Sequence, residues 1–243
     1  MDNIREYYEK VNSYLLRIID EEDKNLESAG NYIGDWLSKD KNNLLHAIGT
    51  GGHSMMGVNE IYKRAGCFAQ INPLFTDAMY YERIPGMITK DMEKYILKKD
   101  EPVLIISHVG MNPFTIETAQ LCKEKGMYLI GLEARDICDR LPPDFTGRAA
   151  SKLNLHDICD VIIDHKTPYG DTLLHIPGID CMMGPISNIL IFFTLHLLEI
   201  KIAERMAKNA YNPPIFTSEN IPGGLEANNL FWGNYKTLIK NWW

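Results

Sequence analysis

The sequence predicts an α/β fold in which a central parallel sheet is covered by helices on both faces. Short apolar runs of strand length alternate with stretches of helical periodicity along most of the chain. The run at residues 102–106, PVLII, is apolar throughout, which is typical of a parallel strand buried on both faces. Two polar turns, residues 49–54 and 107–112, each follow a predicted strand directly.

The composition fits one large domain, or one domain with appendages. The chain has 243 residues, 45% of them apolar, and can bury a substantial core. A net charge of −7 argues against nucleic acid as a partner, although backbone N–H groups can hold a phosphorylated ligand without a basic patch. The five cysteines are scattered and lack a C-x-x-C motif, which indicates reduced thiols. Without an apolar signal segment or membrane-length run, we expect a cytoplasmic protein with no membrane partner.

The chain is expected to begin with a long helix at residues 2–38. Apolar side chains recur there at spacings of three and four, and the resulting stripe must pack on the chain's own core or on a second copy of the chain. Residues 44–48 form the first predicted strand, and residues 55–65 show helical spacing that ends at Gly66. A second short strand is predicted at residues 68–73.

The later elements alternate in the same way. Further strands are predicted at residues 102–106, 128–132, 158–164 and 173–176. Further helices are predicted at about residues 89–98, 114–125, 184–209 and 226–240. The helix at 184–209 is apolar nearly all round, which predicts that it is buried in the core or between subunits.

Two connections are long. Residues 74–100 contain an apolar loop and then the charged helix, and they form either a lid over a site or a surface connection. Residues 136–156 form an excursion with a basic spot at Arg148 and Lys152. Asp171 follows a glycine and is expected to be a turn residue.

The first polar turn can hold an anion. Its three glycines let the backbone approach a ligand closely, and the free N–H groups of the following helical turn point at it. Thr50 and Ser54 add hydroxyl donors. The turn is not a P-loop, because no Gly-Lys-[Ser/Thr] follows, and Ser54 takes the third glycine position of a dinucleotide fingerprint. A tight turn without a ligand is the alternative, but both polar turns are expected at the one sheet edge where ligands collect.

Several short motifs, taken in order, resemble the SIS (sugar isomerase) domain family, and within it the small bacterial proteins labelled phosphoheptose isomerases. The likeness runs from about residue 40 to the C-terminus. The residues that carry it are 49–54, Glu60, 64–66, 71–73, Ser107, 110–113, 170–171, 184–187, 214–220 and 223–224.

The resemblance implies a three-layer α/β/α sandwich of flavodoxin-like type and a homodimer or larger homo-oligomer. Residues 1–40 are expected to be a helical segment for packing or oligomerisation. Residues 41–210 are expected to form the phosphosugar-binding domain, and residues 211–243 a C-terminal extension of the same domain.

The resemblance also implies that the two polar turns bind the phosphate group of a small-molecule sugar phosphate. The candidate phosphate-binding residues are Thr50, Gly51, Gly52, His53, Ser54, Ser107, His108, Gly110, Asn112 and Ser187. One departure from the family pattern is Val109, which replaces the second serine of the second turn. The loss of this hydroxyl weakens phosphate binding or changes the ligand, and it favours a binding role without catalysis.

Isomerisation of an aldose to a ketose through an enediol requires a base near the carbon-bound proton and an acid near the carbonyl oxygen. In the family, a glutamate on the helix after the first turn and a histidine on the late helix, often from the partner subunit, serve these roles. Glu60 and His196 match these positions, and Glu199 is a rival. The alternatives are a solvated Glu60 paired with a basic neighbour at helical spacing and a core His196.

The sequence and the resemblance together predict a phosphosugar isomerase that acts by enediol proton transfer. A non-catalytic phosphosugar sensor and an amino-sugar-phosphate lyase or etherase are the alternatives. No cofactor is expected. No metal site is predicted either, because the histidines lack HxxxH or HExxH spacing.

Overall fold

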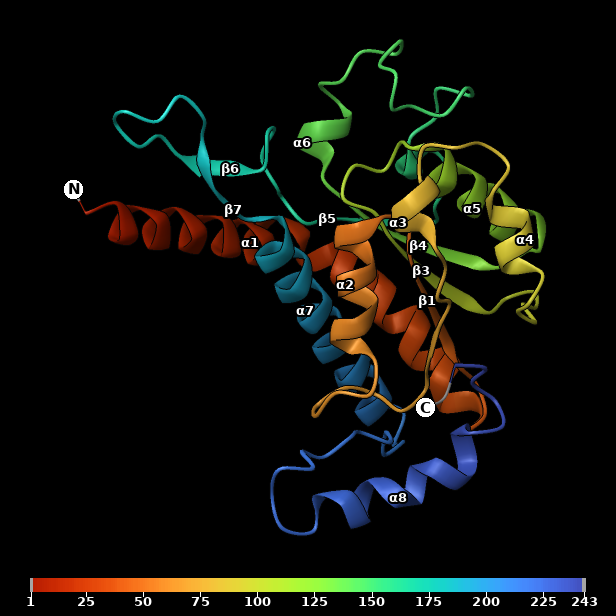
Figure 1. Cartoon of the computed structure of the whole chain (residues 1–243). Coiled ribbons are helices and arrows are strands. Elements are labelled where there is room, and N and C mark those ends of the chain that lie inside the picture. The colour runs from red at the N-terminus through yellow and green to blue at the C-terminus, as the bar shows by residue number, and fades with distance from the viewer. Residues whose placement is uncertain (1, 242–243) are drawn as a thin grey trace.

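A five-stranded parallel sheet in the order β2-β1-β3-β4-β5 forms the centre of the fold in the computed structural model, which describes residues 2–241 (Figure 1). The strands are β1 (Leu45–Gly49), β2 (Ile71–Pro73), β3 (Pro102–Ile106), β4 (Tyr128–Glu133) and β5 (Val161–Asp164). In β1 and β3, Gly49 pairs with Ile106, so the two strands end level with each other. The two polar turns therefore leave the sheet side by side at its carboxyl edge.

Helices cover both faces of this sheet. The longer helices are α1 (Asn3–Lys39), α2 (Gly52–Ile61), α5 (Pro113–Glu124), α7 (Ser187–Lys208) and α8 (Gly224–Tyr235). The short ones are α3 (Ala78–Tyr81), α4 (Ile88–Met92), α6 (Arg135–Cys138) and the 3-10 turn η1 (Leu155–Asp157). Figure 1 shows α1, α2 and α7 on one side of the sheet and α4 and α5 on the other. None of the described helices combines the length and apolar character needed to cross a membrane.

Alternate side chains of the central strand β3 enter the two halves of the core. Leu104 and Ile106 pack in the cluster formed with α1, α2 and α7. Val103 and Ile105 pack in the opposite cluster, where Phe114 of α5 is fully buried. The apolar run of this strand is thus explained by burial on both faces, and the predicted three-layer fold is confirmed.

The helices α1 and α7 approach each other closely at two glycines of α1. A Cβ atom at Gly30 would lie 2.6 Å from the Cβ of Lys201, and one at Gly34 would lie 2.7 Å from the Cβ of Arg205. The C-terminal half of α1 therefore packs on the chain's own core. Its N-terminal half runs past the sheet beside a small hairpin, where the Tyr7 hydroxyl donates to the Pro185 carbonyl over 2.6 Å (Figure 1).

Several element predictions were wrong in detail. The hairpin pairs β6 (Thr172–Leu174) with β7 (Met183–Pro185) in an antiparallel two-stranded sheet, and β7 was not predicted. The helix predicted at 89–98 is shorter and consists of α4, which ends at Met92. The chain then turns and buries Tyr95, whose hydroxyl donates to the Phe75 carbonyl. The predicted strand at 68–73 is reduced to β2, and the last helix spans Gly224–Tyr235 rather than 226–240.

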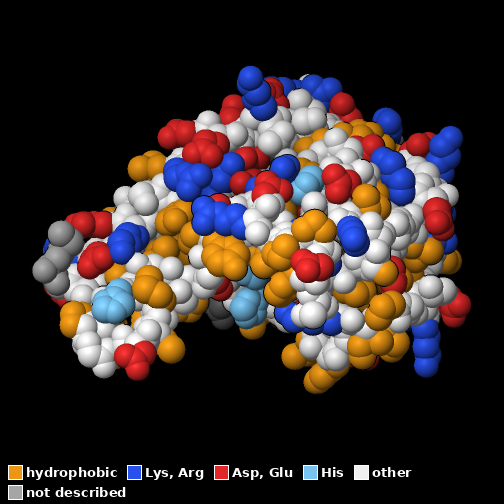
Figure 2. All heavy atoms as spheres, turned by 90° about the horizontal axis from the view of Figure 1, so that it is seen from above, with side chains coloured by type: hydrophobic (Ala, Val, Ile, Leu, Met, Phe, Trp, Pro, Cys, Tyr) orange, Lys and Arg blue, Asp and Glu red, His pale blue; other side chains and the backbone are white. Residues whose placement is uncertain are grey.

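The surface carries charges of both signs. Figure 2 shows Lys and Arg side chains interspersed with Asp and Glu over the face seen from above. The predicted segments at 1–40 and 211–243 include residues 1, 242 and 243, which lie outside the described part of the chain.

Candidate functional site

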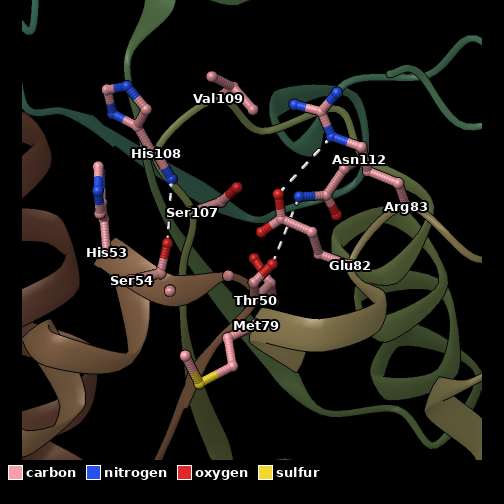
Figure 3. Close-up of a pocket in the computed structure, with 12 residues that line it drawn as sticks. Thr50, His53, Ser54, Met79, Glu82, Arg83, Ser107, His108, Val109 and Asn112 are labelled. Carbon is pink, nitrogen blue, oxygen red and sulfur yellow. Dashed lines mark hydrogen bonds and ion pairs between the residues drawn. The ribbon is translucent and has the colours of Figure 1, made fainter. Parts of the chain in front are cut away.

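The two polar turns line a common pocket of about 280 Å³ (Figure 3). The first turn and the start of α2 contribute Thr50, Gly51, Gly52, His53 and Ser54. The second turn contributes Ser107, His108, Val109 and Asn112. A third wall comes from the α3 segment and consists of Met79, Glu82 and Arg83. Eight of the ten residues predicted to bind phosphate are among these lining residues.

The hydroxyl groups of Ser54 and Thr50 have different roles in the pocket. Ser54 Oγ accepts a hydrogen bond from the backbone N–H of His108 over 3.2 Å, which joins the two turns. The Thr50 hydroxyl is fully buried, lies 3.1 Å from the Ile106 carbonyl to which it donates, and is 2.7 Å from Thr115 Oγ1. Thr50 therefore holds the turn in shape, whereas Ser54 lies at the pocket wall with its own proton available to donate.

Ser107 and Asn112 also organise the backbone. Ser107 Oγ accepts from the Gly110 N–H over 2.9 Å and lies 3.1 Å from Thr115 Oγ1. Asn112 Oδ1 accepts from the Thr115 N–H over 2.8 Å and caps α5. Thr115 is thus shared by both turns, and sequence reasoning missed it. The signal was a threonine three residues after an asparagine in a helix-capping position.

The N-terminus of α2 lacks such a cap. No side chain among the described residues bonds to its first N–H groups, and the first backbone bond of the helix runs from the Met55 N–H to the Gly51 carbonyl. The N–H groups of Gly52, His53 and Ser54 are therefore left for solvent or a ligand. Together with the helix dipole, they favour an anion in this pocket.

The carboxylate of Glu82 lies near the N-terminus of α2, where an anion is favoured. A Cβ atom at Gly51 would be 2.2 Å from Glu82 Oε2, so only glycine accommodates the Glu82 side chain in this pose. Arg83 Nε lies 3.8 Å from Glu82 Oε1 (Figure 3). Burial raises the pKa of Glu82, and the neighbouring Arg83 and His53 side chains counteract this increase. The sequence did not single out Glu82, although the segment at 74–100 was predicted to be either a lid over a site or a surface connection.

Three histidine rings lie next to one another at the pocket. The His53 and His108 ring centres are 5.9 Å apart, and His108 stacks on His165 at 5.8 Å. Burial lowers the pKa of His108, Asp171 counteracts this shift, and His53 adds to it. Burial and repulsion by His108 lower the pKa of His165 to about 3. Both rings are therefore neutral at pH 7. Sequence reasoning missed His165, although it directly follows strand β5 at the same sheet edge.

Glu60 and His196 meet each other, but they do not line this pocket. His196 Nε2 lies 3.1 Å from Glu60 Oε1, and His196 Nδ1 lies 2.9 Å from Glu199 Oε2. Arg64 also pairs with Glu60, at 3.0 Å, as the alternative interpretation expected. The bond to Glu199 raises the pKa of His196, burial opposes the increase, and the bond to Glu60 adds to it.

Two further predicted residues are outside the pocket wall. Gly110 adopts a φ of +65°, and a Cβ atom there would lie 1.9 Å from Glu133 Oε2, so it sits over that carboxylate. Ser187 is the first residue of α7, and its N–H and hydroxyl both donate to Asp171, over 2.7 and 2.8 Å. Asp171, expected as a turn residue, has a φ of +60° and also caps this helix.

Folding assembles two groups of metal-ligating side chains among residues 2–241. One consists of Cys67, His196 and Glu199. The other consists of Glu133, Cys138 and His156. In each group the potential ligand atoms lie within 4.8 Å of one another. The sequence spacing of the histidines did not indicate either group, because its members come from separate elements.

Comparisons with known proteins identify the family. The SIS domain family model matches residues 6–134. A UPF0309 protein of Thermoanaerobacter pseudethanolicus is 30% identical over 248 residues, which cover 97% of this chain and 98% of that protein. A UPF0309 protein of Caldanaerobacter subterraneus is 28% identical over 247 residues, with coverage of 97% and 98%.

The similarity to solved structures concerns the fold. The structure of a phosphoheptose isomerase from Francisella tularensis matches 84% of this chain and 97% of that chain with a TM-score of 0.52, at 14% identity. The family model covers more than half of the chain, and the first relative is similar over nearly its whole length. The chain therefore belongs to the SIS domain family.

Proposed function

We propose that this protein binds a sugar phosphate in the pocket between the two polar turns and interconverts its aldose and ketose forms. The observation that carries the proposal is the arrangement along α2. Its uncapped N-terminus opens into the pocket, and Glu60, which pairs with His196 of α7, lies further along α2. Glu60 follows Ser54 by six residues, a rise of about 9 Å along the helix axis. This separation suits a phosphate at one end of an extended sugar and a carbonyl at the other.

The exposed face of α2 connects the two ends. His53, Met56 and Glu60 follow one another at spacings of three and four, so they lie along one stripe of the helix. Met56 is half exposed, and its sulfur contacts Asn188 of the neighbouring helix α7. A sugar chain lying along this stripe would pass from the phosphate pocket to His196 without entering the core.

Glu60 is assigned the role of base and His196 the role of acid. Glu60 takes the proton from the carbon next to the carbonyl, while His196 gives a proton to the carbonyl oxygen, which yields an enediol. Glu60 then gives the proton to the former carbonyl carbon. His196 takes the hydroxyl proton from the carbon that Glu60 first deprotonated, which completes the exchange. The raised pKa of His196 suits an acid that must carry its proton near neutral pH. The phosphate contacts orient the substrate for these transfers.

A phosphosugar sensor without catalysis is the second candidate, because of two side chains in the pocket. Val109 lines the wall where a hydroxyl donor is expected in the family, and the Glu82 carboxylate faces the same space. Both weaken the hold on a phosphate, which reduces the binding energy available for catalysis.

The deciding experiment uses hexose, heptose and amino-sugar phosphates. Binding is measured as a rise in melting temperature, and interconversion is followed by NMR. We expect turnover by the wild-type chain, and a loss of at least about 100-fold in Glu60→Gln with binding retained, because a general base contributes this much or more. Glu27→Gln, an exposed glutamate on α1, is the control and should not change either quantity.

The other outcomes discriminate between the candidates. Binding by the wild-type protein without turnover of any sugar phosphate would replace the isomerase with the sensor. If no sugar phosphate raises the melting temperature, both the isomerase and the sensor are rejected. Turnover that persists in Glu60→Gln would reject Glu60 as the base while leaving the pocket assignment intact.

A further inference from the structure

Three side chains of zinc-binding types converge behind the second polar turn. Glu133 ends β4, Cys138 ends α6 and His156 lies in η1, so each comes from a different element. His156 Nδ1 is 2.5 Å from Glu133 Oε1 and 4.0 Å from Cys138 Sγ. A zinc ion lies about 2.0–2.3 Å from each of its ligands, so one between these atoms requires only small side-chain movements.

The group is buried, and it has an unused ligand atom. Glu133 and Cys138 are inaccessible to solvent, and the His156 side chain is 15% exposed. Glu133 Oε2 is buried and has no hydrogen-bond partner among the described residues. A buried carboxylate oxygen without a partner is costly, so it calls for a group that the protein atoms do not provide.

The surrounding charges suit a divalent cation. His156 Nε2 lies 3.9 Å from the exposed carboxylates of Asp139 and Asp157, which make the entry side negative. Arg135 Nε is 3.8 Å from Glu133 Oε1 and adds a permanent positive charge beside this carboxylate. With a thiolate, a carboxylate and a neutral imidazole as ligands, a divalent ion gives a neutral centre. Arg135 is then balanced by Asp139, with which it pairs at 3.1 Å.

The donor set indicates which metal. Magnesium and calcium take oxygen ligands, so a set containing a thiol and an imidazole does not suit them. Sulfur, nitrogen and one carboxylate oxygen are zinc ligands, and three protein ligands leave a fourth position for water or for Asp139. Cys138 Sγ lies 3.8 Å from Asp139 Oδ1, close enough for that carboxylate to turn inward.

We propose that Glu133, Cys138 and His156 form a zinc site that fastens the excursion at residues 136–156 to the sheet. The site would hold both ends of the excursion at the end of β4. It would also fix the carboxylate on which Gly110 of the second polar turn rests. The proposal is independent of the proposed isomerase activity, because it uses none of the residues assigned to that reaction.

The metal-free, reduced full-length chain is titrated with zinc by calorimetry against a competing chelator. We expect one ion per chain, and a loss of at least about tenfold in affinity in both Cys138→Ser and His156→Gln, since even partners outside the ligand shell contribute this much. Zinc should raise the melting temperature of the wild-type chain more than that of these variants. Cys67→Ser, in the other cysteine-containing group, is the matched control and should bind zinc like the wild type.

Cobalt(II) provides a readout that does not depend on the stability of a variant. In the wild-type chain it should give a thiolate-to-cobalt charge-transfer band, which is retained in Cys67→Ser and lost in Cys138→Ser. A wild-type spectrum without this band, or wild-type protein that binds no zinc, overturns the proposal. So does zinc binding that is lost in Cys67→Ser but kept in Cys138→Ser.

Discussion

Ser54 Oγ accepts a hydrogen bond from the backbone N–H of His108 over 3.2 Å, although 54 positions separate the two residues in the sequence. The bond joins the end of β1 to the end of β3 through the turns that follow them. Because Ser54 accepts rather than donates here, its hydroxyl proton remains available to a ligand in the pocket. The same contact therefore shapes the pocket and leaves a donor at its wall.

The first prediction concerns this donor. Ser54→Ala should lower the affinity for a bound sugar phosphate about tenfold, because a hydrogen bond to a charged group contributes about 1.5 kcal/mol or more. Calorimetric titration measures the change. Ser13→Ala is the control, since the Ser13 hydroxyl donates to a carbonyl of its own helix α1, far along the chain from the pocket. An affinity that is the same in Ser54→Ala and wild type would contradict a direct phosphate contact.

The second prediction concerns Glu82, whose carboxylate lies against Gly51 where an anion would enter. Glu82→Gln keeps the shape of the side chain and removes its charge, so a sugar phosphate should bind about fivefold more tightly. This corresponds to about 1 kcal/mol of repulsion between two charges roughly 4 Å apart in water. Asp77→Asn, an exposed acidic residue of the same segment, should leave the affinity unchanged. Weaker binding by Glu82→Gln would instead mean that the carboxylate contacts the sugar.

Much of the fold was predictable from the sequence because the central strands are buried on both faces. The run at 102–106 has no polar side chain, and its short length and β-branched residues favour a parallel strand covered on both faces. The β6–β7 hairpin was not predictable in the same way. Its strands are short and partly exposed, and contacts with the distant helix α1 support it, including the bond from Lys10 Nζ to the Leu173 carbonyl over 2.8 Å.

The pocket was predictable in outline and not in its inner arrangement. Two strands that end level bring their turns together. The strand–helix alternation predicts a parallel sheet, but it does not determine the strand order β2-β1-β3-β4-β5. Glu82 could not be assigned to the pocket, because its position depends on how the loop at 74–100 folds back. The buried ring of His165 next to His108 could not be predicted either, because it depends on which strand lies beside β4. Nor does the sequence reveal that the hydroxyl groups of Thr50 and Thr115 hydrogen-bond to each other, since these residues are 65 positions apart.

The third prediction concerns the opposite edge of the sheet and the pH dependence of stability. Glu101 Oε2 lies 3.0 Å from His46 Nε2 and accepts from the Lys98 N–H over 2.7 Å. Asn72 Nδ2 donates to His46 Nδ1, so His46 Nε2 carries the proton that Glu101 accepts. Burial raises the pKa of Glu101, but the bonds from His46 and Lys98 outweigh it, and the pKa lies below its ordinary value of 4.5.

A lowered carboxyl pKa in the folded state means that the charged form is stabilised by folding. This contribution is complete above pH 4.5 and is lost as the pH falls through the lowered pKa. Glu101→Gln should therefore reduce the free energy of unfolding by about 1–2 kcal/mol at pH 7, and the difference should shrink below about pH 4. Urea unfolding at pH 7 and at pH 3.5 tests this, with the exposed Glu93→Gln as control. A difference that stays constant over this range would contradict the charged hydrogen bonds.

The last prediction concerns assembly. Ile189 and Ile200 of α7 are 41% and 54% exposed, and with His196 between them they lie at spacings of seven and four along one face of the helix. We expect this face to pack on a second copy of the chain, so that Ile200→Glu shifts the protein from dimer to monomer in sedimentation velocity experiments. Because the face includes His196, the variant should also lose sugar-phosphate turnover. Ile96→Glu, which alters an 83% exposed isoleucine outside α7, should do neither. A wild-type chain that sediments as a monomer would show that this apolar face has another partner or none.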